Sequence, residues 1–367
     1  MKKKTHSQNY QGYLKLDSLL KAQELLSDKV GKHAHDEMLF IITHQVYELW
    51  FKQIIFETDS ILDAFDRENI DESHVGIVVS RLERINEIQR LLIDQIKVLE
   101  TMTPMDFLDF RDLLTPASGF QSAQFRLIEN KIGLLQERRH KYGDTDYKSK
   151  ISDSDLSEVT KSETSRSIFT LVEQWLERTP FLVFDEFNFW DQYQNAVERM
   201  VKSDREIINT NKQLTDSEKS NYLQQYNVTE KMFNTLFDES MFTKRLNNRE
   251  MRLSYKATHA ALLIFLYRDQ PILHNPYKLL SRLMDLDELL TTWRYKHHLM
   301  VTRMIGRKIG TGGSVGAAYL NQTAEKHRVF EDLTSLTTFL IPRSDLPELP
   351  DYILRNLSFY YDSQDKE

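Results

Sequence analysis

The sequence predicts an all-α protein, and three observations support this prediction. Glycine and proline are scarce, with 11 and 8 among 367 residues. Long windows carry apolar residues at intervals of three and four, which is the spacing that gives a helix one buried face. Clean alternation of apolar and polar residues, which is typical of half-buried strands, is almost absent. The chain is long enough for these helices to bury a large core.

The first strong helix is predicted from residue 36, in the segment HDEMLFIITHQVYELWFKQIIFETDSILDAF. Asp36 is its candidate N-cap, and Glu37 complements the positive end of the helix dipole. A second helix is predicted over about residues 75–99. A third begins at Pro104, a residue favoured in a first helical turn, and ends at TPASG. A fourth starts near Phe120 and carries QSAQFRLIENKIGLLQERR.

The middle of the chain is more polar than its two flanks. Residues 141–165 lack periodicity and are predicted to form a long surface connection. Residues 200–250 are highly charged and contain two further helical patterns. We therefore expect a large helical core, made of residues 1–140 and 251–367, with a smaller, polar helical insertion at residues 141–250.

Composition excludes several classes of function. The formal net charge is −7 and both signs are mixed along the chain, which argues against a nucleic-acid binder. There is no cysteine, so thiolate metal sites and cysteine nucleophiles are excluded, and a reducing compartment fits. The basic start MKKK is followed by no apolar signal region, and MLFII and AALLIFLY are far shorter than a membrane span. We expect a cytoplasmic protein without a membrane partner.

Two adjacent histidines lie in a predicted helix over residues 285–305. His297 follows Trp293 by four residues and precedes Met304 by seven, so it lies in the middle of the apolar face. His298 falls on the side of Arg294, which we expect to be wetter. An inward histidine is either a hydrogen-bonded core residue or a ligand of iron or haem.

A third histidine lies in the helix predicted from residue 36. Phe40, His44, Tyr47, Phe51 and Ile55 follow one another at intervals of four, three, four and four, so they form one aromatic stripe. The stripe is either an aromatic core with one satisfied imidazole or the wall of a pocket.

Arg111 also falls on an apolar helical face, four residues after Phe107. A guanidinium in such a place keeps its charge and needs an anion, which is either a protein carboxylate or the carboxylate of a ligand. The segment GRKIGTGGSVGAAY lacks the pattern of a phosphate-binding loop. It is either a lid over a ligand or a plain connector between helices.

Several blocks of the sequence closely resemble the tryptophan 2,3-dioxygenase family. They are HDEMLFIITHQVYELWFKQIIFE, LDFRDLLTPASGFQSAQFRLIENKIG, FLYRDQP, TTWRYKHHLMVTRMIG, GTGGSVGAAYL and TTFLIPR. The resemblance covers most of the core from Tyr10 to Arg343 and is weak over residues 141–250. It implies an enzyme with haem b, ferrous in its active form, that uses O₂ to convert L-tryptophan to N-formyl-L-kynurenine. This is the first step of tryptophan degradation by the kynurenine pathway.

The resemblance also implies roles for individual residues. His297 falls on the axial iron ligand, with Ser118, Gly119 and Trp293 also at the haem. His44 falls on the catalytic histidine that hydrogen-bonds the indole N–H. The other residues implied at the substrate are Phe40, Ile41, Phe107, Arg111, Thr311, Tyr10 and Tyr13. The last two belong to an N-terminal segment that completes the site of a neighbouring subunit, so the resemblance implies a homotetramer.

The sequence departs from the usual family pattern at three positions. Val315 and Ala317 replace a serine and an aromatic residue after GTGGS, and His298 replaces a small or apolar residue. Two alternatives stay open beside the family reading. An enzyme similar to indoleamine 2,3-dioxygenase would have a broader substrate range, and His44 argues against it. A non-catalytic helical haem sensor would account for His297 but not for a buried Arg111.

Overall fold

The computed structural model describes residues 9–66, 72–139, 147–178, 183–184, 187–306, 308, 323 and 326–357. Most of their regular structure is helical, and the prediction of an all-α fold is confirmed. The helices are α1 (Tyr10–Leu14), α2 (Leu16–Leu19), α3 (Leu26–Lys29), α4 (Asp36–Phe65), α5 (Glu72–Leu99), α6 (Pro104–Arg111), α7 (Ala123–Ile132), α8 (Asp153–Thr164), α9 (Ile168–Glu177), α10 (Phe189–Thr210), α11 (Asp216–Phe237), α12 (Glu239–Asn247), α13 (Tyr255–Leu266), α14 (His274–Ile305), α16 (Glu331–Ser335) and α17 (Asp351–Leu357). A short antiparallel hairpin pairs β1 (Val183–Phe184) with β2 (Phe187–Asn188).

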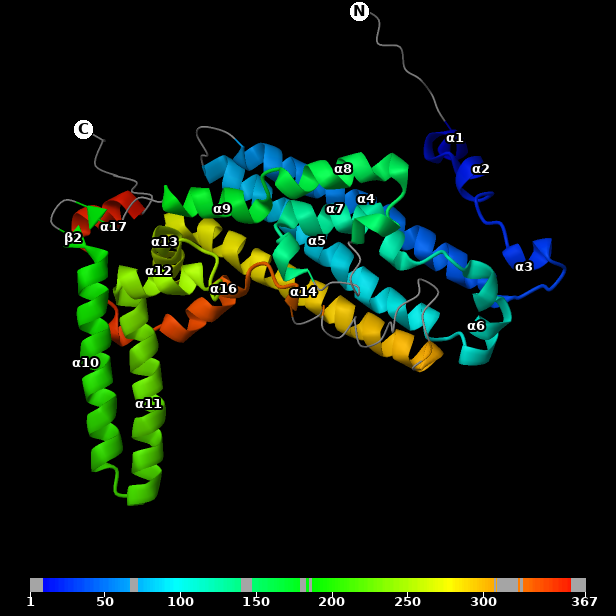
Figure 1. Ribbon diagram of the computed structural model, residues 1–367. Helices are drawn as coiled ribbons and strands as arrows, with labels where there is room; N and C mark the ends of the chain where they lie inside the picture. Colours follow the sequence, from blue (N-terminus) through cyan, green and yellow to red (C-terminus); the bar gives the residue numbers. More distant parts are fainter. Residues whose placement is uncertain are drawn as a thin grey trace, which may run out of the picture.

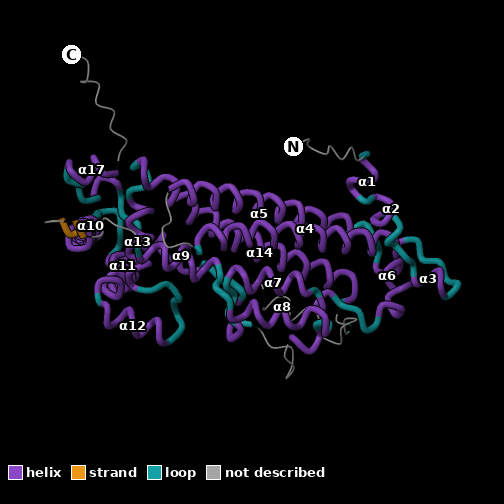
Figure 2. The backbone as a smooth tube through the Cα atoms, turned by 90° about the horizontal axis from the view of Figure 1, so that it is seen from above, coloured by secondary structure: helices purple, strands orange, loops and turns teal. Residues whose placement is uncertain are grey.

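Three long helices, α4, α5 and α14, form the body of the molecule. They run side by side, and α7 lies along α4 (Figures 1 and 2). The bundle buries large apolar side chains from each helix, such as Ile61, Leu82 and Leu283, all with no exposed area. Burial of this apolar surface is the main force that holds the three helices together. α14 contains the predicted helix over residues 285–305 but begins earlier, at His274.

The start of α4 differs from the sequence prediction. Its N-cap is His35, whose backbone is helical (φ −57°, ψ −43°), and no side chain caps the helix. The prediction that Asp36 is the N-cap is wrong, because Asp36 lies inside the first turn. Glu37 is buried and accepts hydrogen bonds from the backbone N–H groups of Leu26 (2.8 Å) and Ser27 (2.9 Å). Its carboxylate therefore ties the start of α3 to α4.

The third and fourth predicted helices form with different bounds. α6 begins at Pro104 as predicted and is held by a capping box between Thr103 and Asp106. The fourth helix, α7, starts at Ala123 and ends at Ile132, so it is shorter than predicted at both ends. Gly133 stops it with φ 113°, a conformation that favours glycine.

The predicted insertion is more helical than the sequence suggested. The prediction of a connection without regular structure over residues 141–165 is wrong, because α8 lies within it and buries Val159 against α7. α9 packs on α4 and α13, whereas α10 and α11 pair as an arm that projects from the body (Figure 1). The boundaries of the insertion stay a prediction.

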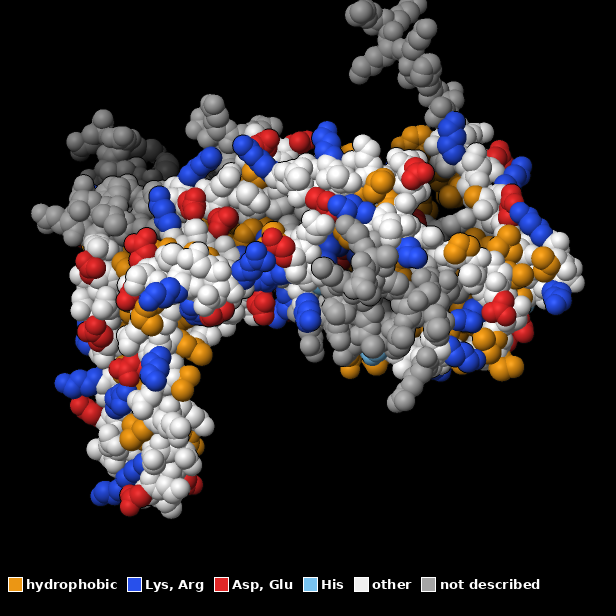
Figure 3. Space-filling view, viewed as in Figure 1, with side chains coloured by type: hydrophobic (Ala, Val, Ile, Leu, Met, Phe, Trp, Pro, Cys, Tyr) orange, Lys and Arg blue, Asp and Glu red, His pale blue; other side chains and the backbone are white. Residues whose placement is uncertain are grey.

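The surface differs between the two ends of the molecule. The α10–α11 arm carries side chains of both charges, and hydrophobic side chains gather at the opposite end, around α3 and α6 (Figure 3). Exposed apolar residues there include Val30 and Met105. Among the helices of the described ranges, none is long and apolar enough to cross a membrane.

Candidate active site

A cavity of about 270 Å³ lies between α4 and α14. Its walls are mostly apolar and aromatic, with a few polar groups, which is the usual character of a small-molecule site. The residues that line it are Phe40, His44, Tyr47, Glu48, Phe51, Ile96, Leu99, Met102, Phe107, Arg111, Ser118, Gly119, Phe120, Ser122, Phe125, Arg126, Glu129, Trp293, Arg294, His297, Met300, Val301, Met304, Ile305, Thr323 and His327.

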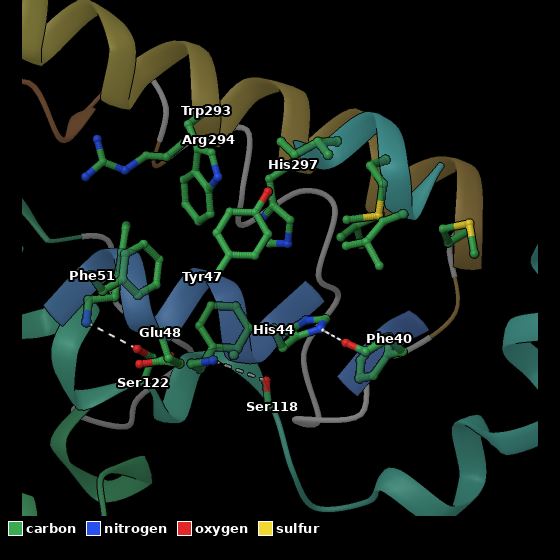
Figure 4. A pocket seen from close by; sticks show the side chains of 18 of the residues that line it. Phe40, His44, Tyr47, Glu48, Phe51, Ser118, Ser122, Trp293, Arg294 and His297 are labelled. Carbon is green, nitrogen blue, oxygen red and sulfur yellow. Dashed lines mark hydrogen bonds between the residues drawn. The ribbon is translucent and has the colours of Figure 1, made fainter. Parts of the chain in front are cut away.

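The α4 wall presents His44 (Figure 4). Its Nδ1 lies 2.7 Å from the carbonyl oxygen of Phe40, one turn earlier. A carbonyl can only accept, so Nδ1 donates and Nε2 of the neutral ring is left as an acceptor. Although the ring is accessible from the cavity, burial among protein atoms lowers the pKa of His44, outweighing the bond to Phe40 and the charge of Glu48. His44 is therefore a neutral acceptor at pH 7.

The α14 wall presents His297, which lies one turn after Trp293 (Figure 4). The two rings are stacked with centroids 5.3 Å apart and an angle of 15° between their planes. Burial lowers the pKa of His297 to about 4, and the nearby imidazoles of His44 and His298 act in the same direction. Its Nδ1 has no hydrogen-bond partner among the described residues. A neutral imidazole held mainly by packing is suited to binding a metal.

One end of the cavity is aromatic and holds Arg111. The ring centroid of Phe40 lies 5.8 Å from that of Phe107 and 5.6 Å from that of Phe110. The Arg111 side chain is 18% exposed, and its Nη1 is 3.5 Å from a carboxylate oxygen of Asp112, which is 93% exposed. A carboxylate so well solvated is a weak partner for the guanidinium of Arg111. Both anions predicted for Arg111, a protein carboxylate and the carboxylate of a ligand, therefore stay open.

The other end of the cavity holds a buried ion cluster that the sequence analysis missed. Glu129 is 1% exposed and lies 2.7 Å from Arg126, 2.5 Å from Arg139 and 2.9 Å from Arg294. Burial opposes ionisation of Glu129, but the arginines hold its pKa well below the usual range. Arg294 lies on the side of the helix that we expected to be wetter, but its side chain turns into this cluster and the residue is 3% exposed, whereas Tyr295 on the same side is 50% exposed.

The remaining predicted site residues differ in where they lie. Ser118 and Gly119 line the cavity beside Phe120. Ile41 is not among the residues that line the described cavity. Tyr10 and Tyr13 lie on α1, are 75% and 72% exposed, and do not line the cavity of their own chain.

Thr311, Val315 and Ala317, and with them most of the glycine segment, lie outside the described residues.

The histidines determine what kind of metal site fits. Among the described residues, no group of three or more histidine, aspartate and glutamate side chains is placed to hold a metal ion. His297 instead offers a single neutral imidazole on an apolar wall, with Nδ1 unpartnered among those residues. This arrangement fits a metal whose other ligands come from a macrocycle, because such a metal needs one axial protein ligand.

Comparison with known proteins points to the same chemistry. A family model described as tryptophan 2,3-dioxygenase matches residues 1–340. Proteins named tryptophan 2,3-dioxygenase from Bdellovibrio bacteriovorus and Dictyostelium discoideum are 52% and 48% identical, over 96% and 95% of this chain and 98% and 88% of their own. Tryptophan 2,3-dioxygenase B of Danio rerio is 47% identical over 93% of this chain and 84% of its own. The chain belongs to the tryptophan 2,3-dioxygenase family.

Proposed function

We propose that the cavity between α4 and α14 is where this chain carries out the reaction of its family, the dioxygenation of L-tryptophan. The product is N-formyl-L-kynurenine, formed in the first step of the kynurenine pathway. The observation that supports this placement best is the composition of one cavity. Two neutral histidines line its opposite walls, and an arginine lies at one end.

The family depends on haem, and we assign haem b to this cavity, where His297 would bind its iron. The neutral ring of His297 and the flat aromatic surface of Trp293 support the assignment. Ser118 and Gly119 line the same cavity and would contact the edge of the group. When bound, ferrous haem supplies the binding and activation of O₂, so that both oxygen atoms enter the indole C2–C3 bond.

In this proposal His44 orients the indole ring. Its Nδ1–H is used by the carbonyl oxygen of Phe40, so Nε2 is the acceptor available to the indole N–H. A neutral imidazole is too weak a base to remove this proton easily, so His44 positions the substrate and does not need to deprotonate it. Phe40 and Phe107 form the apolar wall against the indole.

Arg111 holds the substrate carboxylate in the same proposal. Its guanidinium lines the cavity next to Phe107 and is mostly buried. A planar fork of N–H groups matches a carboxylate in two parallel hydrogen bonds, which fixes the orientation of the α-carbon as well as its position. Thr311, outside the described residues, is assigned to the ammonium end on the family pattern alone.

We also infer a homotetramer in which each N-terminal segment completes the cavity of a neighbour. Tyr10, Tyr13 and Leu20 are exposed apolar residues on α1 and just after α2, at 75%, 72% and 70%. Exposed apolar surface of this kind is typical of a protein interface. Deletion of residues 1–14 should lower both turnover and the assembled mass, measured by tryptophan kinetics and light scattering. A full-activity tetramer after the deletion would contradict the inference.

Because the chain has no cysteine, we place this assembly in the cytoplasm.

The test of the proposed function is spectroscopic and kinetic. Purified protein should show the Soret band of haem, and addition of L-tryptophan to the reduced protein should change the spectrum. In air, one O₂ should be consumed for each N-formyl-L-kynurenine formed, with no external reductant used per turnover. A haem spectrum that L-tryptophan leaves unchanged, without turnover, would indicate a haem sensor instead.

A further inference from the structure

A second, much smaller cavity lies between four helices, behind the wall of the candidate active site. We call it the interhelical cavity. Its volume is about 10 Å³, which is at the lower limit for one water molecule. The helices α4, α5, α7 and α14 contribute two residues each to its lining: Phe51, Ile54, Gln89, Leu92, Phe125, Ile128, Leu290 and Trp293. The lining is aliphatic or aromatic at every position except Gln89.

The amide of Gln89 is buried without a hydrogen bond. The residue is 3% exposed, and neither Oε1 nor Nε2 has a hydrogen-bond partner among the described residues. Two neighbouring amides on α5 do donate to backbone carbonyl oxygens. Nδ2 of Asn86 donates to Arg282 at 3.0 Å, and Nε2 of Gln95 donates to Thr43 at 3.0 Å. Burial of an amide costs free energy unless its polar atoms are hydrogen-bonded, so Gln89 needs a partner in the space that it lines.

Water matches this amide better than an apolar molecule does. The side chain of Gln89 presents a carbonyl oxygen that accepts and an NH₂ group that donates, and a water molecule can bond to either of them. A small apolar molecule such as dioxygen would suit the other lining residues but would leave the amide without hydrogen bonds. Buried waters in proteins usually satisfy polar groups of this kind. The chemistry of the lining therefore favours water.

Trp293 connects the interhelical cavity to the candidate active site. It lines both cavities, whereas Gln89 lines only the smaller one. In the larger cavity its indole ring is stacked with His297, with ring centroids 5.3 Å apart (Figure 4). A space left unfilled beside the indole would forfeit packing contacts on that side. An occupant of the interhelical cavity therefore restrains the ring against which His297 packs.

We propose that Gln89 binds one water molecule in the interhelical cavity and that Gln89, through this water, is a positioning residue for Trp293. The ring of His297 depends on the same arrangement, because it is stacked on Trp293 and its Nδ1 has no hydrogen-bond partner among the described residues. The water site stands on the interhelical cavity alone. Only its effect on His297 as a haem ligand rests on the proposed function.

Crystal structures of the full-length protein, at a resolution that shows ordered water, test the water site. The parent should hold one water within hydrogen-bond distance of Oε1 or Nε2 of Gln89. Gln89→Met has a similar length but no amide, and it should lose the water. Gln89→Glu, whose carboxyl is kept neutral by burial, should retain it. Gln95→Met is the matched control and should also retain it, because Gln95 lines neither cavity.

A parent cavity without water, or one that takes up xenon in its place, would overturn the proposal. So would an amide of Gln89 that is bonded to protein atoms instead. A parent that shows the water but binds no haem would contradict the proposed function and leave the water site intact.

The positioning role is tested by NMR of the indole N–H groups and by resonance Raman spectroscopy of the ferrous protein. The chain has four tryptophans, so Trp293→Phe identifies the Trp293 signal by its loss. This signal and the stretching vibration between iron and His297 should both shift in Gln89→Met. Both should stay in place in Gln89→Glu and Gln95→Met. A Gln89→Met protein that loses the water but leaves both signals unchanged would overturn the positioning role, whatever its melting temperature.

Discussion

The two walls of the cavity each present a histidine, but they hold it in different ways. On α4 the ring of His44 is fixed by a hydrogen bond from Nδ1 to the carbonyl oxygen of Phe40. On α14 the ring of His297 is stacked on Trp293, and its Nδ1 has no hydrogen-bond partner among the described residues. Burial keeps both rings neutral.

This difference explains how one residue type serves two tasks in one cavity. A fixed tautomer gives His44 a defined acceptor and so a preferred orientation for an N–H donor. A ring held by packing leaves the tautomer of His297 to be set by what it binds, which suits a metal ligand. We therefore assign the α14 wall to the cofactor and the α4 wall to the substrate.

The largest expected effect belongs to the α14 wall. His297→Ala removes the axial ligand and should weaken haem binding by more than the roughly 10–100-fold that is typical for losing a residue that only orients a ligand. The amount of haem that the variant retains after gel filtration measures this loss of binding. His298→Ala is the control and should keep its haem. Loss of haem in His298→Ala with retention in His297→Ala would reverse the assignment.

Arg111→Ala should have the next largest effect, on the substrate side. A desolvated carboxylate would lose its partner, which costs about 3–5 kcal/mol for a broken buried pair. We expect this loss in kcat/KM for L-tryptophan and little further loss for tryptamine, which has no carboxylate. Arg111→Lys should recover only part of it, because an ammonium lacks the planar fork. Equal losses for both substrates, with a lower melting temperature, would make Arg111 a structural ion-pair residue.

His44→Ala should have a smaller effect than either. It removes one acceptor from a desolvated pocket, which typically costs about 1–3 kcal/mol, while the haem stays bound. The loss should appear in tryptophan kinetics and leave the amount of bound haem unchanged. Parent kinetics in this variant would exclude His44 from the substrate site.

The pH dependence should be the smallest effect and comes from the α4 wall. Burial lowers the pKa of His44 from its ordinary value of 6.5, so the acceptor is lost only as pH falls through that lower value. An imidazole with pKa 6.5 would lose about fourfold of its neutral form between pH 7.5 and 6. We expect kcat/KM to fall by less than this, and the fall to be absent in His44→Ala. A full fourfold fall in the parent alone would show that the ring is not desolvated.

Local patterns in the sequence were enough to predict the residues on each wall. Helical periodicity placed His297 in the apolar face of one helix and His44 in the aromatic stripe of another, and the structure brings both to one cavity. The same periodicity predicted α5 and most of α14. These features depend on neighbours within about two turns, which a single sequence records directly.

Features that depend on distant residues were not predicted. The ion pair of Arg294 with Glu129 joins residues 165 positions apart, so nothing near Arg294 in the sequence shows that its charge is buried. α8 was missed for a similar reason, because its polar sequence has few apolar positions and Val159 gains its burial from α7. The clue available in the sequence was Arg126 and Glu129, two charged residues three positions apart among Phe125, Leu127 and Ile128.

The ferrous absorption spectrum of three proteins, recorded after haem is added, tests the division of the walls most directly. The parent and His44→Ala should give the same ferrous spectrum before substrate is added, because His44 does not bind the iron. His297→Ala should lack that spectrum, and added imidazole should restore it in part by replacing the lost ligand. A ferrous spectrum that is unchanged in His297→Ala but altered in His44→Ala would contradict the account.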